Sequence, residues 1–500
     1  MRLFTPATRT ITATRNITTG RYLTHPTIST TRLPTTAPTI QNNHGNQIRA
    51  YSSSSGAEKG TPQPPPFNPE TYLHQATKTL SNIPPKLIPD TLHPTQSHLL
   101  SLALSSHLPS ICLPAGFSFF TSSSSSSPFP WPQPEQAALL PGYHLAYYPL
   151  QTPPQLLFPD GTDADHCPGA PFTRRMWAGG RIEFGTGSEQ NFNVDGRKTV
   201  CVETLGTPPV VQIGKMGKEE EQRVWVDVWR TYVTFPPETP SKQMEEVVRD
   251  VVRDLQAAGA GAGAGGQECA TISEAEKASK EGVISELRRL VFLREREPGS
   301  KLEPARVIRV PHQPDFSFKM TPDATLLFQF SALTFNAHAI HLDPLYAREV
   351  EGYKERLVHG PLTLVIMLRA VEGFLRAASS STSTVTSAGA DTDPATAAHA
   401  ATHISEGIRE RLFIPEEEPK KKTQWEIASI EYKNLRPLFV GEEMKVCVRL
   451  LPNKQQQKNG VDEAGLGLCL GEPRRERVDV WIEAPDGGLA VKGTVGVESR

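Results

Sequence analysis

From Met1 to Gly56 the sequence contains neither aspartate nor glutamate, and the first acidic residue is Glu58. The same stretch is rich in threonine and serine, and its positive charge comes from Arg2, Arg9, Arg15, Arg21, Arg32 and Arg49. This composition is typical of a mitochondrial presequence, because the potential across the inner membrane draws a cationic segment inward. We expect residues 1–51 to direct import into the mitochondrial matrix, with cleavage near Tyr51–Ser52. A disordered Thr-rich tail and a chloroplast peptide are the alternatives.

Other absences exclude further classes of protein. The six cysteines form no CxxC or CxxH pair, which argues against a zinc site or a disulfide framework. No run of about 18 apolar residues occurs, so we expect no transmembrane helix and no stable membrane insertion. The net charge is only −2 and no Lys/Arg cluster is interleaved with aromatics, so we expect no nucleic-acid partner.

Low-complexity stretches divide the rest of the chain. Residues 52–67 are rich in Ser, Gly and Pro and are typical of a linker, as is the Ala/Gly run within 256–284. Two structured segments remain, at 68–255 and 285–500. In the first, helical patterning precedes segments with strand-like alternation, which indicates an α+β unit with an antiparallel sheet.

The second segment contains a strongly apolar stretch, Pro361–Arg376. Its apolar residues cover most of a helical circumference, so we expect a helix that is buried on most sides. Gly360-Pro361 suits its start, since proline is tolerated at the first helical position. We expect Thr325–Phe330 to be an apolar strand. Further strands are predicted at Trp425–Tyr432, Met444–Leu451, Arg477–Ile482 and Leu489–Val497.

Polar residues crowd the stretch that precedes this helix, where Asn336, His338, His341 and Asp343 lie between two apolar segments. Buried polar groups cost free energy when they are unpaired, so a site there must satisfy or use them. Backbone N–H groups at a helix start stabilise developing negative charge, and Pro361 has none, which leaves the Gly360 amide as the donor. A histidine beside such a donor suits the removal of a proton from a carbon next to a carbonyl group.

The segment 330–361 resembles the MaoC-like hydratases, and more narrowly the fungal mitochondrial 3-hydroxyacyl-thioester dehydratases of type 2 and the bacterial mesaconyl-CoA hydratases. The most specific pieces are Ser331–Asp343 and His359–Leu362. The resemblance extends weakly upstream through 174–180, and downstream it covers 434–442 and 487–493. The resemblance implies a double hot-dog, in which each unit is a long central helix wrapped by an antiparallel sheet. It also implies that the N-terminal half shapes the acyl pocket and that the C-terminal half carries catalysis.

The wider family has an aspartate and a histidine five residues apart, a spacing that places Asn336 and His341 at these two positions. An amide cannot act as a general base, so we assign the proton transfers to His341. Asn336 would hold the substrate hydroxyl or a water molecule, and the Gly360 amide would bind the thioester carbonyl oxygen. We place His359 and Asp343 in the substrate-binding set.

Each of these residues also has a structural interpretation. Asn336 could be a turn residue, and His341 a structural hydrogen-bonding group. Asp343 could cap a short helix that begins near Pro344, while His338 and His359 could serve packing alone. A metal site built from His338, His341 and Asp343 is the weakest hypothesis, and we expect neither a metal nor a cofactor.

The leading function is the dehydration of (3R)-3-hydroxyacyl thioesters of acyl carrier protein or CoA to trans-2-enoyl thioesters, in mitochondrial fatty acid synthesis. One alternative is hydration of short branched dicarboxylyl-CoA, which a charged pocket lining would favour over a long apolar tunnel. The other is a non-catalytic subunit that binds acyl thioesters, an alternative that Asn336 keeps open. The resemblance leaves homodimerisation open.

Overall fold

A computed structural model describes residues 67–115, 117, 138–185, 192–206, 222–260, 283–296, 307–379, 401–402, 404–412, 425–452 and 474–499. The expected presequence and the first linker, except Phe67, lie outside these residues. So do residues 261–282, which make up most of the second expected linker.

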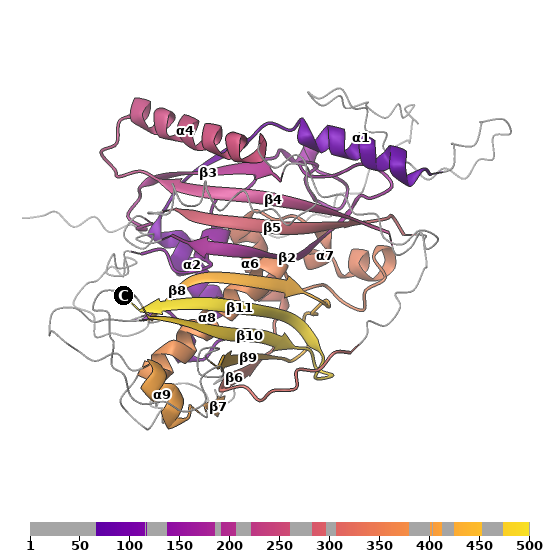
Figure 1. Ribbon diagram of the computed structural model, residues 1–500. Coiled ribbons are helices and arrows are strands. Elements are labelled where there is room, and N and C mark those ends of the chain that lie inside the picture. The colour runs from indigo at the N-terminus through magenta and orange to yellow at the C-terminus, as the bar shows by residue number, and fades with distance from the viewer. Residues whose placement is uncertain are drawn as a thin grey trace, which may run out of the picture. The chain divides into compact units, whose positions relative to one another are not determined.

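The described chain forms one antiparallel sheet with helices packed on it (Figure 1). The strands are β1 (Lys86–Thr91), β2 (Arg174–Phe184), β3 (Lys198–Leu205), β4 (Arg223–Thr234), β5 (Ile284–Leu293), β6 (Phe316–Met320), β7 (Ala401–Thr402), β8 (Trp425–Asn434), β9 (Met444–Leu450), β10 (Arg475–Glu483) and β11 (Leu489–Ser499). The α-helices are α1 (Pro69–Ser81), α2 (Pro94–Leu104), α4 (Ser241–Ala260), α6 (Ala324–Thr334), α7 (Ala339–Leu342), α8 (Gly360–Ser379) and α9 (Glu406–Leu412).

The order of the strands shows two copies of one arrangement. The sheet runs β1-β3-β4-β5-β2-β8-β11-β10-β9-β6-β7. Apart from the two-residue β7, each half has one strand before its central helix (α2 or α8) and four strands after it. The orders 1-3-4-5-2 and 8-11-10-9-6 mirror each other about the β2–β8 pair. Arg181 of β2 lies opposite Glu431 of β8 at this junction. The fold is therefore α+β, and it is a double hot-dog with one continuous sheet.

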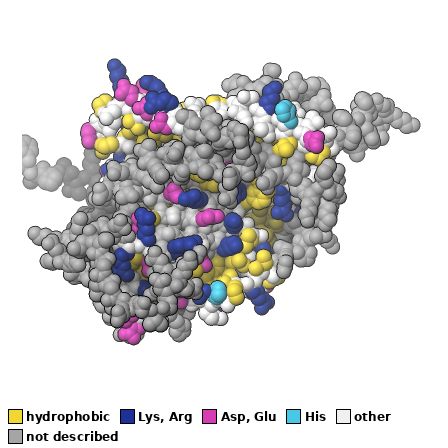
Figure 2. All heavy atoms as spheres, in the orientation of Figure 1, with side chains coloured by type: hydrophobic (Ala, Val, Ile, Leu, Met, Phe, Trp, Pro, Cys, Tyr) yellow, Lys and Arg dark blue, Asp and Glu magenta, His cyan; other side chains and the backbone are white. Residues whose placement is uncertain are grey.

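The two faces of the sheet differ in polarity, as strand alternation requires. On β10, for example, Val478, Val480 and Ile482 are fully buried beneath the helices. Figure 2 shows Lys, Arg, Asp and Glu side chains over the opposite face. The helices α2, α6 and α8 all lie behind the sheet in the view of Figure 1. Helix α8 packs against β2, β8, β9 and β10, so it contacts strands of both halves.

Helix α8 is buried along most of its length, which confirms the prediction made from its apolar circumference. Its charged member Arg369 is also fully buried. The Arg369 Nε donates to the carbonyl oxygen of Cys112 at 2.8 Å, and Nη1 lies 2.6 Å from a Glu372 carboxylate oxygen. A buried charge needs such partners, and here they tie α8 to the N-terminal half.

Three expectations need correction. Thr325–Phe330 is not a strand but part of helix α6, whose first turn is capped by the Asp323 carboxylate accepting from the Leu326 amide at 2.7 Å. A short apolar run does not distinguish a buried strand from a buried helix.

The strand β5, which we assigned to the second unit, pairs with β2 and β4 and completes the first unit. The central helix of the first half is also short, since α2 has 11 residues against 20 in α8.

Among the described helices, none combines the length and the apolar content needed to cross a bilayer.

Candidate active site

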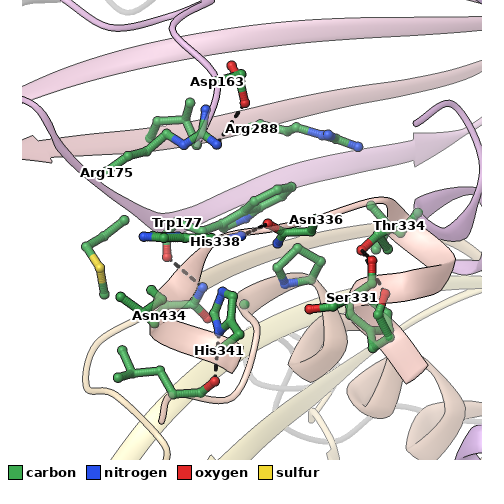
Figure 3. Close-up of a pocket in the computed structure, with 18 of the residues that line it drawn as sticks. Asp163, Arg175, Trp177, Arg288, Ser331, Thr334, Asn336, His338, His341 and Asn434 are labelled. Carbon is green, nitrogen blue, oxygen red and sulfur yellow. Dashed lines mark hydrogen bonds and ion pairs between the residues drawn. The ribbon is translucent and has the colours of Figure 1, made fainter. Parts of the chain in front are cut away.

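A cavity of about 740 Å³ lies where the two halves meet, and residues of both halves line it. Its C-terminal wall includes Ser331, Asn336, His338, His341 and Gly360. The opposite wall comes from β2, β3, β4, β5 and the loops before β2, and it carries Asp163, His166, Arg175, Trp177, Glu203, Arg230 and Arg288. Figure 3 shows these two walls facing each other. Most ligand sites are largely apolar with a few convergent polar groups, and this cavity fits that description.

His341 sits on the single turn of α7 and is only 8% exposed. Its Nδ1 lies 2.8 Å from the carbonyl oxygen of Leu357. A carbonyl oxygen can only accept, so Nδ1 carries the proton and the Nε2 lone pair remains available to act as a base. Burial lowers the pKa of His341 to about 4, against the smaller opposite effect of the Leu357 hydrogen bond. The ring is therefore neutral near pH 7.

Asn336 follows the end of α6. Phe335 ends that helix in the left-handed region, at φ 51°, and the Asn336 amide donates to the Ser331 carbonyl oxygen at 2.9 Å. The Asn336 Oδ1 accepts from the His338 backbone amide at 3.0 Å. Its Nδ2 is then the part of the side chain that can serve a ligand in the cavity. Asn336 is thus both a turn residue and a lining residue.

Helix α8 begins at Gly360, where the chain passes close to both halves. A Cβ at this position would lie 2.9 Å from Asn434 Nδ2 and 3.1 Å from Trp177 Cβ. Asn434 in turn donates from Nδ2 to the Trp177 carbonyl oxygen at 2.8 Å, across the β2–β8 junction. Any larger residue would displace this junction, which explains why the helix starts on a glycine. The first backbone amides of a helix have no partner within it.

Two residues of the expected substrate-binding set lie outside the cavity lining. His359 is fully buried, and its ring stacks on that of His341 with 3.7 Å between centroids. Its Nε2 lies 2.8 Å from the Ser331 Oγ. Asp343 is exposed, and its Oδ1 accepts from the backbone amides of Leu345 and Tyr346. Asp343 therefore caps the next turn, as one of our interpretations had it, and His359 supports the wall from behind.

His338 completes a group of three close imidazoles. It is 8% exposed, its ring centroid lies 5.5 Å from that of His341, and its Nε2 lies 3.6 Å from an Asp160 carboxylate oxygen. Burial, and after it the neighbouring His341, holds the pKa values of His338 and His359 well below their usual range. Since the Asp343 carboxylate is engaged elsewhere, these residues do not converge on a metal. No group of three potential metal ligands occurs in the part of the chain that the structure describes.

The resemblance implied that the N-terminal half shapes the pocket, but sequence reasoning identified none of the residues that line this wall. Arg175 pairs with Asp163 at 2.9 Å, and the Arg288 Nε lies 2.8 Å from a Glu286 carboxylate oxygen. The Arg288 guanidinium also lies over the Trp177 ring, 4.9 Å from its centroid. Arg175 and Trp177 belong to a stretch that the resemblance had marked, but without a role. Only the contact between distant strands shows that they face His341.

Comparison with known proteins gives consistent results. The sequence pattern of the family "Hydroxyacyl-thioester dehydratase type 2" matches residues 142–250 and 218–385. The mitochondrial hydroxyacyl-thioester dehydratase type 2 of Schizosaccharomyces pombe is 26% identical over 274 residues, which are 54% of this chain and 73% of that protein. The mesaconyl-C(4)-CoA hydratase of Chloroflexus aurantiacus is 46% identical over 74 residues, 15% of this chain; the match spans only about a quarter of that protein (26%).

Among solved structures, a MaoC-like dehydratase from Phytophthora capsici aligns with a TM-score of 0.42 and 14% identity, over 84% of this chain and 97% of that one. A double-hotdog protein from Mycobacterium tuberculosis aligns with a TM-score of 0.37 and 10% identity, over 85% and 98%. From the family pattern and the S. pombe relative, the chain belongs to the hydroxyacyl-thioester dehydratase type 2 family of MaoC-like hot-dog hydro-lyases.

Proposed function

We propose that this chain removes water from (3R)-3-hydroxyacyl thioesters to give trans-2-enoyl thioesters, and catalyses the reverse hydration. The observation that carries the proposal is the neutral His341, whose Nδ1 is fixed by Leu357 and whose Nε2 remains available at the cavity. A general base must present a lone pair to the carbon that loses its proton, and this tautomer does so.

The proposed steps use three groups of the C-terminal wall. The His341 Nε2 takes the proton from C2, and the electron pair moves onto the thioester carbonyl oxygen. The Gly360 amide stabilises the negative charge on that oxygen. The C3–O bond then breaks as the electron pair returns to form the C2–C3 double bond. The leaving oxygen takes the proton from the His341 imidazolium and departs as water, while the Asn336 Nδ2 donates to that oxygen.

A single histidine can serve both transfers, because its protonated form in this buried site is a stronger acid than an ordinary imidazolium. The low pKa of His341, about 4, means that the imidazolium returns its proton readily. Both transfers then occur on the same face of the substrate. The N-terminal half, which we extend to include β5, would shape the acyl pocket, and the C-terminal half would carry the catalytic groups.

The charged wall supports a second candidate, the hydration of short branched dicarboxylyl-CoA. In both ion pairs the arginine is the more accessible partner: the side-chain exposures are 19% for Arg175 and 4% for Asp163, and 14% for Arg288 and 0% for Glu286. The guanidinium groups are therefore the more exposed charges of this wall, although the Asp163 carboxylate also lines the cavity. This orientation favours an acyl group with an acceptor, such as a carboxylate, at its far end.

The acid-free first 56 residues support a mitochondrial location, as does the mitochondrial description of the S. pombe relative. We place the activity in mitochondrial fatty acid synthesis, with acyl carrier protein or CoA as the carrier.

The test is hydration of three thioesters by the purified full chain: crotonyl-CoA, a longer 2-enoyl-CoA and mesaconyl-CoA. Turnover of crotonyl-CoA and of the longer substrate supports the leading function. A preference for mesaconyl-CoA that Arg288→Gln abolishes supports the second. If the folded protein binds but turns over none of them, the non-catalytic alternative replaces both.

A further inference from the structure

The start of helix α8 alone supplies only one hydrogen-bond donor to the proposed oxyanion site. Helix α8 begins Gly360-Pro361, and proline has no backbone N–H, so this turn offers the Gly360 amide but no second adjacent donor. Sites that stabilise an oxyanion commonly combine backbone N–H groups with side-chain donors such as serine. A second donor should therefore come from another element of the same wall.

Ser331 meets the geometric requirements for this donor. It lies in the last turns of α6, is 4% exposed and, like Gly360, lines the cavity. Figure 3 shows Ser331 and His341 on the same side of the pocket, opposite Arg175 and Arg288. The Ser331 Oγ lies 2.8 Å from the Nε2 of His359, the residue immediately before Gly360. One side chain thus connects Ser331 to the start of α8.

The direction of this hydrogen bond follows from the environment of His359. The ring is fully buried and neutral, since burial holds its pKa well below the usual range, so it carries one proton. Its Nδ1 has no hydrogen-bond partner among the described residues. A buried N–H without an acceptor is rarer in proteins than an acceptor without a donor. The proton therefore belongs on Nε2, which donates to the Ser331 Oγ.

A hydroxyl group that accepts from His359 keeps its own proton for another acceptor. No hydrogen bond from the Ser331 Oγ to a second described side chain occurs, and the cavity lies on its open side. We propose that Ser331 is the second donor to the thioester oxygen, and that His359 is a positioning residue that turns the Ser331 hydroxyl proton into the cavity. This inference rests on the proposed dehydratase function and adds a catalytic residue to it.

Kinetics of the full chain with crotonyl-CoA test the role of Ser331. Loss of an oxyanion donor lowers kcat by about 10²–10³-fold, and we expect this of Ser331→Ala with KM changed little. Ser101→Ala is the matched control: Ser101 is 3% exposed, its Oγ lies 2.9 Å from the Tyr143 hydroxyl, and it does not line the cavity. Ser101→Ala should leave kcat near the wild-type value. Should Ser331→Ala fail to fold, Ser331→Cys, which keeps the volume but donates weakly, takes its place.

Two substitutions of His359 test its positioning role. Gln places an N–H close to the position of the imidazole Nε2, whereas Leu removes the donor and keeps much of the volume. We expect His359→Gln to retain kcat within about 10-fold and His359→Leu to fall as far as Ser331→Ala. Equal loss in folded His359→Gln and His359→Leu would contradict the positioning role.

A spectroscopic measurement tests the role of Ser331 independently of turnover. Acetoacetyl-CoA forms an enolate whose absorbance reports the charge on the oxygen that the site should stabilise. Wild type should lower the pH midpoint of the bound enolate, and Ser331→Ala should raise it by at least one unit relative to wild type. An unchanged midpoint together with a wild-type kcat in Ser331→Ala overturns the inference while leaving the proposed function intact. If wild type hydrates no thioester, the proposed function fails, and the enolate midpoint still decides whether Ser331 stabilises an oxyanion.

Discussion

The imidazole of His341 stacks on the imidazole of His359, with 3.7 Å between ring centroids and 24° between ring planes. A charge on either ring would face a second buried ring with no carboxylate between them, so both remain neutral. Of the three close histidines, only His341 both lines the cavity and has its Nδ1 proton fixed by a carbonyl oxygen, as a base at Nε2 requires. The other two rings set its environment and its orientation.

Replacing His341 by alanine should lower kcat by about 100-fold or more, as expected for the loss of a general acid and base. Circular dichroism should show a folded protein, and hydration of crotonyl-CoA should be measured beside His338→Ala. We expect His338→Ala to reduce mainly the midpoint of unfolding. A folded His341→Ala protein with the wild-type rate would rule out His341 as the proton-transfer residue.

The pH dependence of kcat/KM should show the low pKa of His341. Burial lowers this pKa to about 4, so the base is neutral over most of the accessible range. For dehydration, kcat/KM should stay level from pH 8 to about pH 5.5 and fall only below it. An acidic limb centred near 6.5, the value of an unperturbed histidine, would contradict the buried environment.

The three buried histidines, His338, His341 and His359, also make the stability of the fold depend on pH. Their folded pKa values are depressed, so between about pH 6.5 and pH 4 the unfolded chain binds protons that the folded chain does not. Stability should therefore be highest above pH 6.5 and fall as the pH drops through this window. Urea unfolding at pH 7.5 and pH 5 should show a lower midpoint at pH 5, and His338→Ala should reduce the difference.

Part of this site was predictable from the sequence. The five-residue spacing from Asn336 to His341 and the Gly360-Pro361 start pointed to residues that the structure brings to one cavity. The hydrogen bond from His341 to Leu357 and the stacking on His359 were not predictable, because they depend on how α7 sits against the segment before α8. Ser331 lay in the expected region, but its role needs α6 to be a helix rather than the strand that we expected.

For the fold, too, part was predictable from the sequence and part was not. Apolar alternation placed β8, β9, β10 and β11 well, because one face of each strand is buried. The assignment of β5 failed for a different reason: its partners, β2 and β4, are set by pairing over long sequence distances. Low-complexity stretches mark insertions in the chain, and they do not mark where one half of a sheet ends.

Substitutions of Asn336 test what its side-chain amide contributes to activity at a position where the wider family has aspartate. Asn336→Ala should cost less activity than His341→Ala if the side chain only holds the leaving oxygen. Asn336→Asp should retain or raise activity, because an oxygen can still accept from the His338 amide and the carboxylate can act as a base. The carboxylate should also raise the pKa of His341 and move the acidic limb to higher pH. An inactive but folded Asn336→Asp protein would show that the donor Nδ2 is required.

Import should depend on the acid-free N-terminal region. A fluorescent fusion of residues 1–60 should enter mitochondria, and the mature protein should begin near Ser52. Substituting Arg2, Arg9, Arg15 and Arg21 by glutamate should abolish import, because the membrane potential would then repel the segment. Cytosolic fluorescence of the unaltered fusion with an intact N-terminus would contradict the targeting role.

Gly360→Ala should lower kcat without unfolding the protein. The added Cβ would lie 2.9 Å from Asn434 Nδ2, closer than real contacts allow, and 3.1 Å from Trp177 Cβ, so the start of α8 must move. A shift of a few tenths of an ångström misplaces the amide that we propose to hold the thioester oxygen, and a loss of about 10–100-fold is expected on that ground. Gly407→Ala in α9 is the matched control, since its Cβ would meet no described atom within 4 Å. That variant should keep full activity and gain slightly in stability, because alanine favours a helix over glycine by roughly 1 kcal/mol. Equal activity in the two variants would mean that the Gly360 amide does not hold the reacting oxygen.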